Sequence, residues 1–262
     1  MKTNNSLLSR VLGVDIGGSG TRAAPVDVRT GTLSAAPYRV PLTESSTPET
    51  VMATISETLA HFGWSGPLGC GYPGVVRDGV ANSAANVSSA WLNVNVRQKL
   101  TALTGGPVVV INDADAAGLA EMHFGAGRTR NHAAGGTVLM ITLGTGIGSA
   151  FFHNGRLFPN TEFGHVYLPQ GIEGEALAAG SIRVSDDLSW EDWGTRVNLY
   201  LQEMDKLISP DLIIIGGGVS ENFDRFKPYL TVKPDVVPAR MGNDAGIVGA
   251  ALAVLLPDRE QI

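Results

Sequence analysis

The sequence predicts an α/β protein built from two similar halves. The first half begins with residues 11–33, an apolar strand that runs into Asp15, then a glycine-rich corner and a second strand. Residues 138–157 repeat the same order of strand, glycine corner and strand. Such a repeat indicates two copies of one structural unit. Because a glycine corner lets backbone N–H groups approach an anion, two facing corners suggest a polyphosphate chain held between two domains.

The composition is that of a globular protein with a surplus of acidic residues. Its 262 residues suffice for one large or two modest domains with buried cores. Hydrophobic residues make up 44% of the chain, and 25 acidic against 19 basic residues give a net charge of −6. That charge argues against a general surface for nucleic acid or anionic membranes. We therefore expect neither as a partner, and any polyanionic ligand must be held locally.

The cysteine content and the N-terminal segment bear on the cellular compartment. A single cysteine, Cys70, excludes an internal disulfide and a multi-cysteine zinc site, and we expect it to be a small buried apolar residue. Residues 1–10 lack the apolar run of a signal peptide, and no stretch approaches the roughly 18 apolar residues of a membrane span. We therefore expect a cytoplasmic protein.

The first half continues with further strands, a helix and a polar loop. Three strands are predicted before the first helix, at residues 12–16, 21–28 and 33–40. Thr47 and Pro48 predict the start of a helix that ends near Gly63, and the next strand covers residues 68–71. The amides of residues 82–91 could hydrogen-bond a sugar. They could equally belong to a surface loop packed over Trp91.

The polar pair Asn112–Asp113 lies between a predicted strand, residues 108–111, and a predicted helix, residues 114–124. Ligands of α/β sheets usually bind at such strand ends. A carboxylate at this position could accept the proton of a substrate hydroxyl as a general base. Capping the helix N-terminus is the commoner role of an aspartate there. Asn112 could orient a second hydroxyl or simply end the strand.

The second half carries two further polar features. Residues 125–136 are predicted to form a linker whose basic side chains could meet an anionic substrate or only face solvent. Glu162 and His165, three residues apart, could bind a polyol through charge-assisted hydrogen bonds or belong to a structural loop. A metal site is a weaker interpretation because no companion ligands stand at a useful spacing.

The chain then closes with two helices and one glycine-ended strand. Ser189 is predicted to cap a core helix over residues 190–208. The strand at residues 212–215 runs into Gly216, Gly217 and Gly218, which suit a flat purine or ribose against the backbone, or a tight turn before a helix from Ser220. Residues 245–256 predict a small, apolar helix packed across both halves.

Together these motifs resemble the ROK family (repressors, open reading frames and kinases) of actin-like sugar kinases, from Val11 to Val254. The resemblance rests on residues 15–21, 143–148 and 216–218 in this order. Five further segments resemble the polyphosphate glucokinases within that family: residues 84–87, 112–118, 159–162, 188–191 and 243–249.

The resemblance implies an actin-like (ribonuclease H-like) ATPase fold, with two similar domains and a cleft between them. It places residues 1–113 in the N-terminal domain and residues 114–244 in the C-terminal domain. The terminal segment, residues 245–262, is expected to pack back on the first domain.

The resemblance also implies roles for individual residues. Asp113 matches the catalytic base that takes the proton of the sugar 6-hydroxyl, and Asp15 matches the carboxylate near Mg²⁺, bound directly or through water. The other matched sugar contacts are Asn86, Asn112, Glu162 and His165, with Glu175 as an additional candidate. The phosphate loops match Gly17, Gly18, Ser19, Gly20, Thr21 and Arg22 in the first half and Gly144, Thr145, Gly146 and Gly148 in the second. The adenosine loop matches Gly216, Gly217 and Gly218.

The implied activity is phosphoryl transfer from inorganic polyphosphate, ATP or both to the 6-hydroxyl of glucose, with mannose as a second candidate substrate and Mg²⁺ as cofactor. The protein is expected to be a monomer or a homodimer. Alternatives are an ATP-only glucokinase, an N-acetylhexosamine kinase and a non-kinase actin-like ATPase. Transcriptional repressors of the family carry a helix-turn-helix ahead of the first phosphate loop, for which the ten residues before Val11 are too few.

Two departures from the family pattern stand out. Many members carry a cysteine-rich zinc motif after the matching histidine, whereas residues 166–180 contain no cysteine, so we expect no structural zinc. Arg22 stands where a lysine is common. A long polyphosphate would also need a basic track from the cleft, for which the candidates are Arg22, Arg128, Arg130, His132, Lys227, Lys233 and Arg240.

Overall fold

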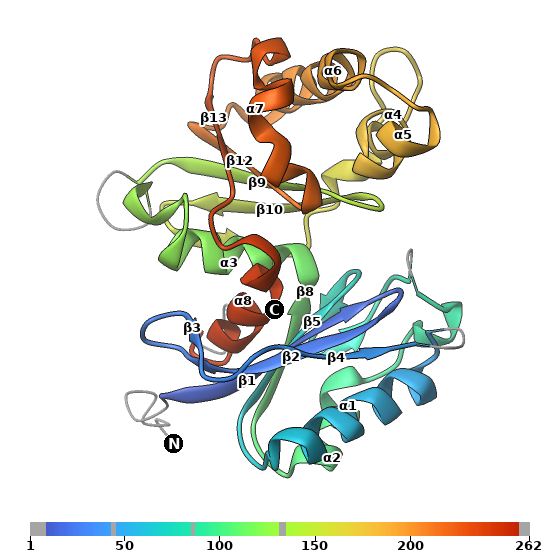
Figure 1. Ribbon diagram of the computed structural model, residues 1–262, viewed down its shortest axis with the longest axis vertical. Helices are drawn as coiled ribbons and strands as arrows, with labels where there is room; N and C mark the ends of the chain where they lie inside the picture. The colour runs from blue at the N-terminus through green and yellow to red at the C-terminus, as the bar shows by residue number, and fades with distance from the viewer. Residues whose placement is uncertain (1–8, 43–45, 85–86, 131–134, 257–262) are drawn as a thin grey trace. The chain divides into compact units, whose positions relative to one another are not determined.

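The computed structural model describes residues 9–42, 46–84, 87–130 and 135–256. The chain divides into two compact units, Met1–Ala120 with Asp244–Ile262 and Glu121–Asn243. Each unit has its own sheet, flanking helices and hydrophobic core (Figure 1). In the described part of the chain, no helix combines the length and hydropathy needed to cross a bilayer.

The first unit is organised by a six-stranded sheet in the order β3-β2-β1-β5-β8, with β4 also paired to β2. Its strands are β1 (Arg10–Gly17), β2 (Gly20–Asp27), β3 (Thr32–Leu33), β4 (Tyr38–Pro41), β5 (Leu68–Tyr72) and β8 (Val108–Asn112). A separate hairpin joins β6 (Val76–Arg77) to β7 (Val80–Ala81). Because β1, β5 and β8 run parallel, their carboxyl ends share one sheet edge, which carries Asp15, Tyr72 and Asn112.

One predicted strand of this unit is wrong. Residues 33–40 do not form one strand but contribute to β3 and β4, which pair with different parts of β2. Pro37 lies between them and has no N–H to donate to a ladder. The chain therefore leaves β2 at Val26 and rejoins it at Ala23. The other predicted strands of the first half are confirmed to within two residues.

Helices cover both faces of the first sheet. The helix α1 (Pro48–Phe62) is confirmed between the predicted signals, since Thr47 accepts a hydrogen bond from the Thr50 N–H and Gly63 is left-handed with φ of 55°. It packs with α2 (Val96–Thr104) over the buried face of β1 and β5. The helix α8 (Ala245–Ala253) packs on the other face, so closely that a side chain at Gly69 would overlap the Ala250 carbonyl.

The second unit repeats the strand order of the first. Its sheet runs β11-β10-β9-β12-β13, in which the first three strands are antiparallel and β12 and β13 run parallel to β9, as in β3-β2-β1-β5-β8. The strands are β9 (Thr137–Leu143), β10 (Ile147–His153), β11 (Arg156–Phe158), β12 (Leu212–Gly216) and β13 (Asp235–Pro238). The repeat in the sequence thus corresponds to a repeat of topology.

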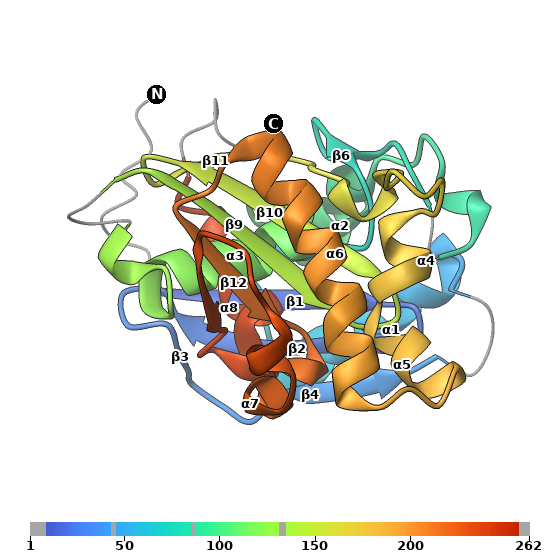
Figure 2. The same ribbon diagram turned by 90° about the horizontal axis from the view of Figure 1, so that it is seen from above.

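The long helix α6 (Trp190–Ile208) lies across the second sheet (Figure 2). Its cap at Ser189 and its apolar face are confirmed, because Trp193, Val197 and Met204 pack against β9 and β12. The smaller helices are α4 (Gly174–Ala178), α5 (Gly180–Ser185) and α7 (Phe223–Phe226). The predicted helix from Ser220 starts as a 3₁₀ turn and reaches only four α-helical residues. The remaining helix, α3 (Asp113–Phe124), follows β8 and ends in the second unit.

Candidate active site

The first glycine corner is the tip of the β1–β2 hairpin. Gly17 pairs with Gly20, and Gly18 and Ser19 are exposed at the tip. Thr21 differs from its neighbours because its side chain is buried and donates a 3.1 Å hydrogen bond to Thr54. Only the backbone of Thr21 is therefore placed to face an anion at this corner.

Asp15 lies opposite Arg22 in the β1–β2 ladder. Burial raises the pKa of the Asp15 carboxyl, while the positive charge of Arg22 acts in the opposite direction. Arg22 also forms a 3.2 Å ion pair with Asp244, which precedes α8. An arginine at this position can therefore hold α8 against β2 as well as contribute positive charge to the corner.

Asp15 and Asp113 lie on either side of Gly71, in β5. A Cβ on Gly71 would be 3.7 Å from Asp15 Oδ1 and 3.5 Å from Asp113 Cα. The parallel registers of β1, β5 and β8 cause this proximity, since Gly71 pairs with Asp15 on one side and with Ile111 on the other. Two carboxylates from distant parts of the sequence thus share one sheet edge.

The pair Asn112–Asp113 forms the start of α3. The Asn112 side chain is 5% exposed. Its Oδ1 accepts hydrogen bonds from the backbone N–H groups of Ala114 and Asp115 at 2.8 and 3.0 Å, so asparagine is the helix cap. Its amide donates to the Gly74 carbonyl at 3.1 Å. Asp113 is half-buried and accepts a hydrogen bond from the Ala114 N–H at 2.8 Å.

The loop after β5 is held by Ser83. The Ser83 hydroxyl accepts a 2.8 Å hydrogen bond from the Val75 N–H, and its carbonyl accepts one of 2.9 Å from the Tyr72 hydroxyl. These bonds support the Gly74 carbonyl that Asn112 contacts. Asn86, the other predicted sugar contact of this unit, lies outside the described residues.

The second glycine corner joins β9 to β10 and is braced from α4 and α5. Glu175 Oε2 accepts a 2.8 Å hydrogen bond from the Ile147 N–H, and a side chain at Gly146 would overlap that oxygen. The Ser181 hydroxyl donates to the Thr145 carbonyl at 2.7 Å. Gly144 and Thr145 remain exposed. The structure thus places Glu175, a candidate sugar contact, as a support of this corner.

The triple-glycine loop packs directly on the same corner. Gly217 has a φ of 79°, and a Cβ there would approach the Leu143 carbonyl oxygen to 2.5 Å. Gly216 ends β12, and Gly218 has no atom near the position of a Cβ. Only glycine allows this close approach, so the two predicted anion- and adenosine-binding loops of the second unit adjoin each other.

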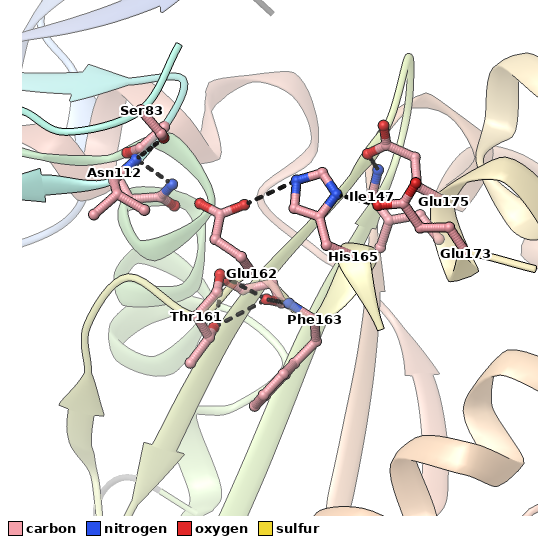
Figure 3. A network of polar contacts seen from close by, with 12 residues as sticks. Ser83, Asn112, Ile147, Thr161, Glu162, Phe163, His165, Glu173 and Glu175 are labelled. Atoms are coloured by element: carbon pink, nitrogen blue, oxygen red, sulfur yellow. Dashed lines mark hydrogen bonds and ion pairs between the residues drawn. The ribbon is translucent and has the colours of Figure 1, made fainter. Parts of the chain in front are cut away.

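A cluster of carboxylates surrounds His165 in the same unit (Figure 3). His165 Nδ1 lies 2.5 Å from Glu173 Oε1, and Nε2 lies 3.8 Å from Glu162 Oε2. The hydrogen bond with Glu173 raises the pKa of His165. Burial raises the pKa of Glu162, against the influence of His165. Among the described residues, nothing hydrogen-bonds to the buried Oε1 of Glu162, so this oxygen can accept a ligand hydroxyl.

Glu173 belongs to this cluster but is not among the residues predicted from the sequence. Residues 168–172 form a turn closed by the Leu168–Ile172 backbone bond, with Gly171 left-handed, and the bridge of Tyr167 with Glu173 brings this carboxylate back toward His165. Pro169 and Gly171 are the local signals of such a turn. Within the described ranges, no group of three or more histidine, cysteine, aspartate or glutamate side chains could hold a metal ion.

Comparison with known proteins places the chain among sugar kinases and their relatives. The sequence profile described as the ROK family matches residues 11–182. A polyphosphate glucokinase of Mycobacterium tuberculosis is 46% identical over 92% of this chain and 89% of its own length.

Two solved structures are also similar. The inorganic polyphosphate/ATP-glucomannokinase of Arthrobacter sp. strain KM has a TM-score of 0.87 and 42% identity, covering 94% of this chain and 98% of its own. A ROK family glucokinase of Streptomyces griseus, solved with glucose and AMPPNP, shares the fold with a TM-score of 0.76 and 24% identity, covering 92% and 98%. The predicted actin-like ATPase fold is confirmed by these matches.

Proposed function

Since this chain belongs to the ROK family, we propose that it transfers a phosphoryl group from inorganic polyphosphate or ATP to the 6-hydroxyl of glucose, and also of mannose. The proposal is carried by the Asp113 carboxylate, which starts α3 next to Asn112 and lies across Gly71 from Asp15. The similarity to the polyphosphate glucokinase and to the glucomannokinase extends over almost the entire chain and supports the same substrates here.

In this proposal, Asp113 is the general base. A carboxylate at a helix N-terminus stays ionised near neutral pH and can take the proton of the sugar 6-hydroxyl as its oxygen attacks phosphorus. Asn112 positions Asp113 by capping α3, and its amide can donate a hydrogen to a second hydroxyl. The role of Asp113 is therefore chemical, and that of Asn112 is largely to fix the geometry.

The carboxylates of the second unit orient the sugar. Glu162 offers a hydroxyl an oxygen that has no hydrogen-bond partner in the described part of the chain, and His165, held by Glu173, offers its other ring nitrogen. Charge-assisted hydrogen bonds of this kind bind polyols tightly and with directional preference. Glucose and mannose differ only in the configuration at C2, so a site that contacts C2 only weakly would accept both.

The glycine corners hold the donor. Their backbone N–H groups can bind phosphate oxygens, and phosphoryl transfer depends mainly on such positioning and on neutralising charge. Asp15 fits a magnesium ion, because one carboxylate plus donor phosphate oxygens is an ordinary Mg²⁺ ligand set, and a bound cation would offset the burial that raises the pKa of this carboxyl. Bound Mg²⁺ would neutralise charge on the transferring phosphate.

The test is the initial rate of sugar 6-phosphate formation from glucose and from mannose, with nucleotide-free polyphosphate and with ATP, in the presence of Mg²⁺. We expect activity with both donors. Activity with ATP alone would leave an ATP-only glucokinase, and no activity with either donor would refute the proposal. Asp113→Asn keeps the size of the side chain and should lower kcat at least a hundredfold while circular dichroism stays unchanged.

A further inference from the structure

A pocket on the second unit is lined by four basic side chains. These belong to Arg130, Lys227, Lys233 and Arg240, which define what we call the basic pocket. Its volume is about 650 Å³, and its lining contains one carboxylate, Asp235. Because the whole chain has a net charge of −6, this grouping is a local reversal of sign. Such a pocket concentrates anions.

The four basic side chains of the basic pocket form no ion pair with the carboxylates that the structure describes. The Lys227 ammonium lies 5.8 Å from the Phe223 ring centroid. Lys227, Lys233 and Arg240 are exposed, and Arg130 is half-buried. They can therefore pair with an anion from solution.

A buried carboxylate holds the two walls of the basic pocket together. Glu121 is 0% exposed. Its Oε1 accepts hydrogen bonds from the Arg240 and Met241 N–H groups at 2.8 and 2.6 Å, and its Oε2 accepts one from the Ala126 N–H at 2.7 Å. Arg240 follows β13, and Ala126 precedes β9, so one side chain joins segments that are distant in sequence. The pocket is a supported feature of the fold.

The basic pocket extends along the edge strand β13 toward the triple-glycine loop. Val236 and Val237 of β13 line it, as does Leu212 at the start of the neighbouring strand β12. At its other end, Arg240 follows Ala239, whose Cβ would lie 3.8 Å from a Cβ on Gly216. Arg240 thus lies beside the loop that ends β12, and Lys233 precedes the other end of the four-residue strand β13.

We propose that the basic pocket binds a segment of inorganic polyphosphate remote from the phosphoryl group being transferred. The proposal rests on the proposed function and gives the long donor a path on the second unit. A linear chain of phosphates carries a charge at every unit, so it can pair with several of the four cations at once. In the proposed function, the triphosphate of ATP binds at the glycine corners and is too short to follow β13. The basic pocket therefore favours long polyphosphate over ATP.

The kinetic test uses the double variant Lys227→Gln/Lys233→Gln. We expect its KM for long-chain polyphosphate to rise about tenfold, since one exposed ion pair contributes up to about fivefold. Its kcat, its KM for ATP and its KM for glucose should stay within about twofold of wild type. The salt dependence of the polyphosphate KM should also become shallower.

The matched control is Arg156→Gln/Lys206→Gln. It also removes two positive charges from the second unit, but these lie on β11 and α6, outside the lining of the basic pocket. Its KM for polyphosphate should remain near that of wild type. Equal effects of the two double variants would show that only net charge matters and would overturn the proposal.

A binding measurement separates the basic pocket from the donor activity. Long-chain polyphosphate is titrated onto Asp113→Asn protein saturated with a non-hydrolysable ATP analogue. We expect binding to persist and to weaken when the two lysines are replaced, even if the wild-type enzyme transfers phosphate only from ATP. If polyphosphate no longer binds when the ATP analogue saturates the protein, the proposal for the basic pocket is wrong, whatever the outcome for the proposed function. Equally tight binding of single-stranded DNA, with an unchanged polyphosphate KM in the lysine variant, would identify a nucleic-acid site instead.

Discussion

Replacing Glu121 should destabilise the protein by more than any exposed substitution. Its carboxylate is fully buried and accepts three backbone hydrogen bonds of 2.6 to 2.8 Å. Glu121→Ala would leave three N–H groups without this acceptor and open a cavity. An unsatisfied buried donor costs about 1–3 kcal/mol, and loss of the carboxylate desolvation cost offsets part of the total. We expect the free energy of unfolding to fall by about 3–5 kcal/mol.

The isosteric variant Glu121→Gln separates hydrogen bonding from volume. Its carbonyl oxygen can still accept from Arg240 and Met241, but its amide would face the Ala126 N–H, so two donors would oppose each other. We expect a loss of about 1.5–3 kcal/mol, smaller than that of Glu121→Ala.

The assay is equilibrium urea unfolding followed by tryptophan fluorescence and circular dichroism, with Glu203→Gln as control. Glu203 pairs with Lys206 on the surface of α6, so its replacement should cost less than about 1 kcal/mol. If Glu121→Ala unfolds within 1 kcal/mol of wild type at an unchanged m-value, the carboxylate does not hold the pocket walls. The same variant should raise the KM for long-chain polyphosphate if the walls separate.

Two further predictions concern the glycines and His165. Gly69→Ala should lower the free energy of unfolding in urea by about 2–4 kcal/mol, because a methyl group would overlap the Ala250 carbonyl. Gly144→Ala should unfold like wild type, because no atom lies within 4 Å of its Cβ, but it should raise the KM for the donor. Glu173 raises the pKa of His165, so the pair stabilises the fold below about pH 6.5 and this contribution fades as the pH rises through the raised pKa. Glu173→Gln should therefore lower the free energy of unfolding by about 0.5 kcal/mol at pH 6 and by almost nothing at pH 9. It should also raise the KM for glucose at constant kcat. Equal losses of stability at both pH values would contradict this prediction.

Much of the fold follows from local signals in the sequence. The glycine corners, the Thr47–Gly63 helix limits and the Ser189 cap depend on residues within a few positions of each other, so periodicity and capping chemistry suffice to predict them. Pro37 is a local signal of a break in a strand, but the division of residues 33–40 depends on which part of β2 each fragment pairs with. This pairing is a contact between separate strands, so it is fixed only when the sheet forms.

The roles of the site residues divide in the same way. The sequence alone determined that Asn112–Asp113 follows a strand, that a glycine corner follows Asp15, and that no cysteine-rich zinc motif follows His165. Only the tertiary structure decided that Asn112 is the cap of α3 and that Asp15 and Asp113 flank Gly71. The register of β1, β5 and β8 places Asp15 and Asp113 beside Gly71, and no local sequence pattern encodes strand register.

Long-range contacts explain the features that the sequence left scattered. Glu121 reaches Arg240 across 119 residues, and Arg22 reaches Asp244 across 222. Four of the seven candidates for a basic track line one pocket: Arg130, Lys227, Lys233 and Arg240. Arg22 pairs with Asp244, and Arg128 is exposed outside the pocket lining. His132 lies outside the described residues. The sequence supplied the charges and the glycines. Their grouping was decided by the packing of β13 and α3, because charges far apart in the chain become neighbours only when the sheet forms.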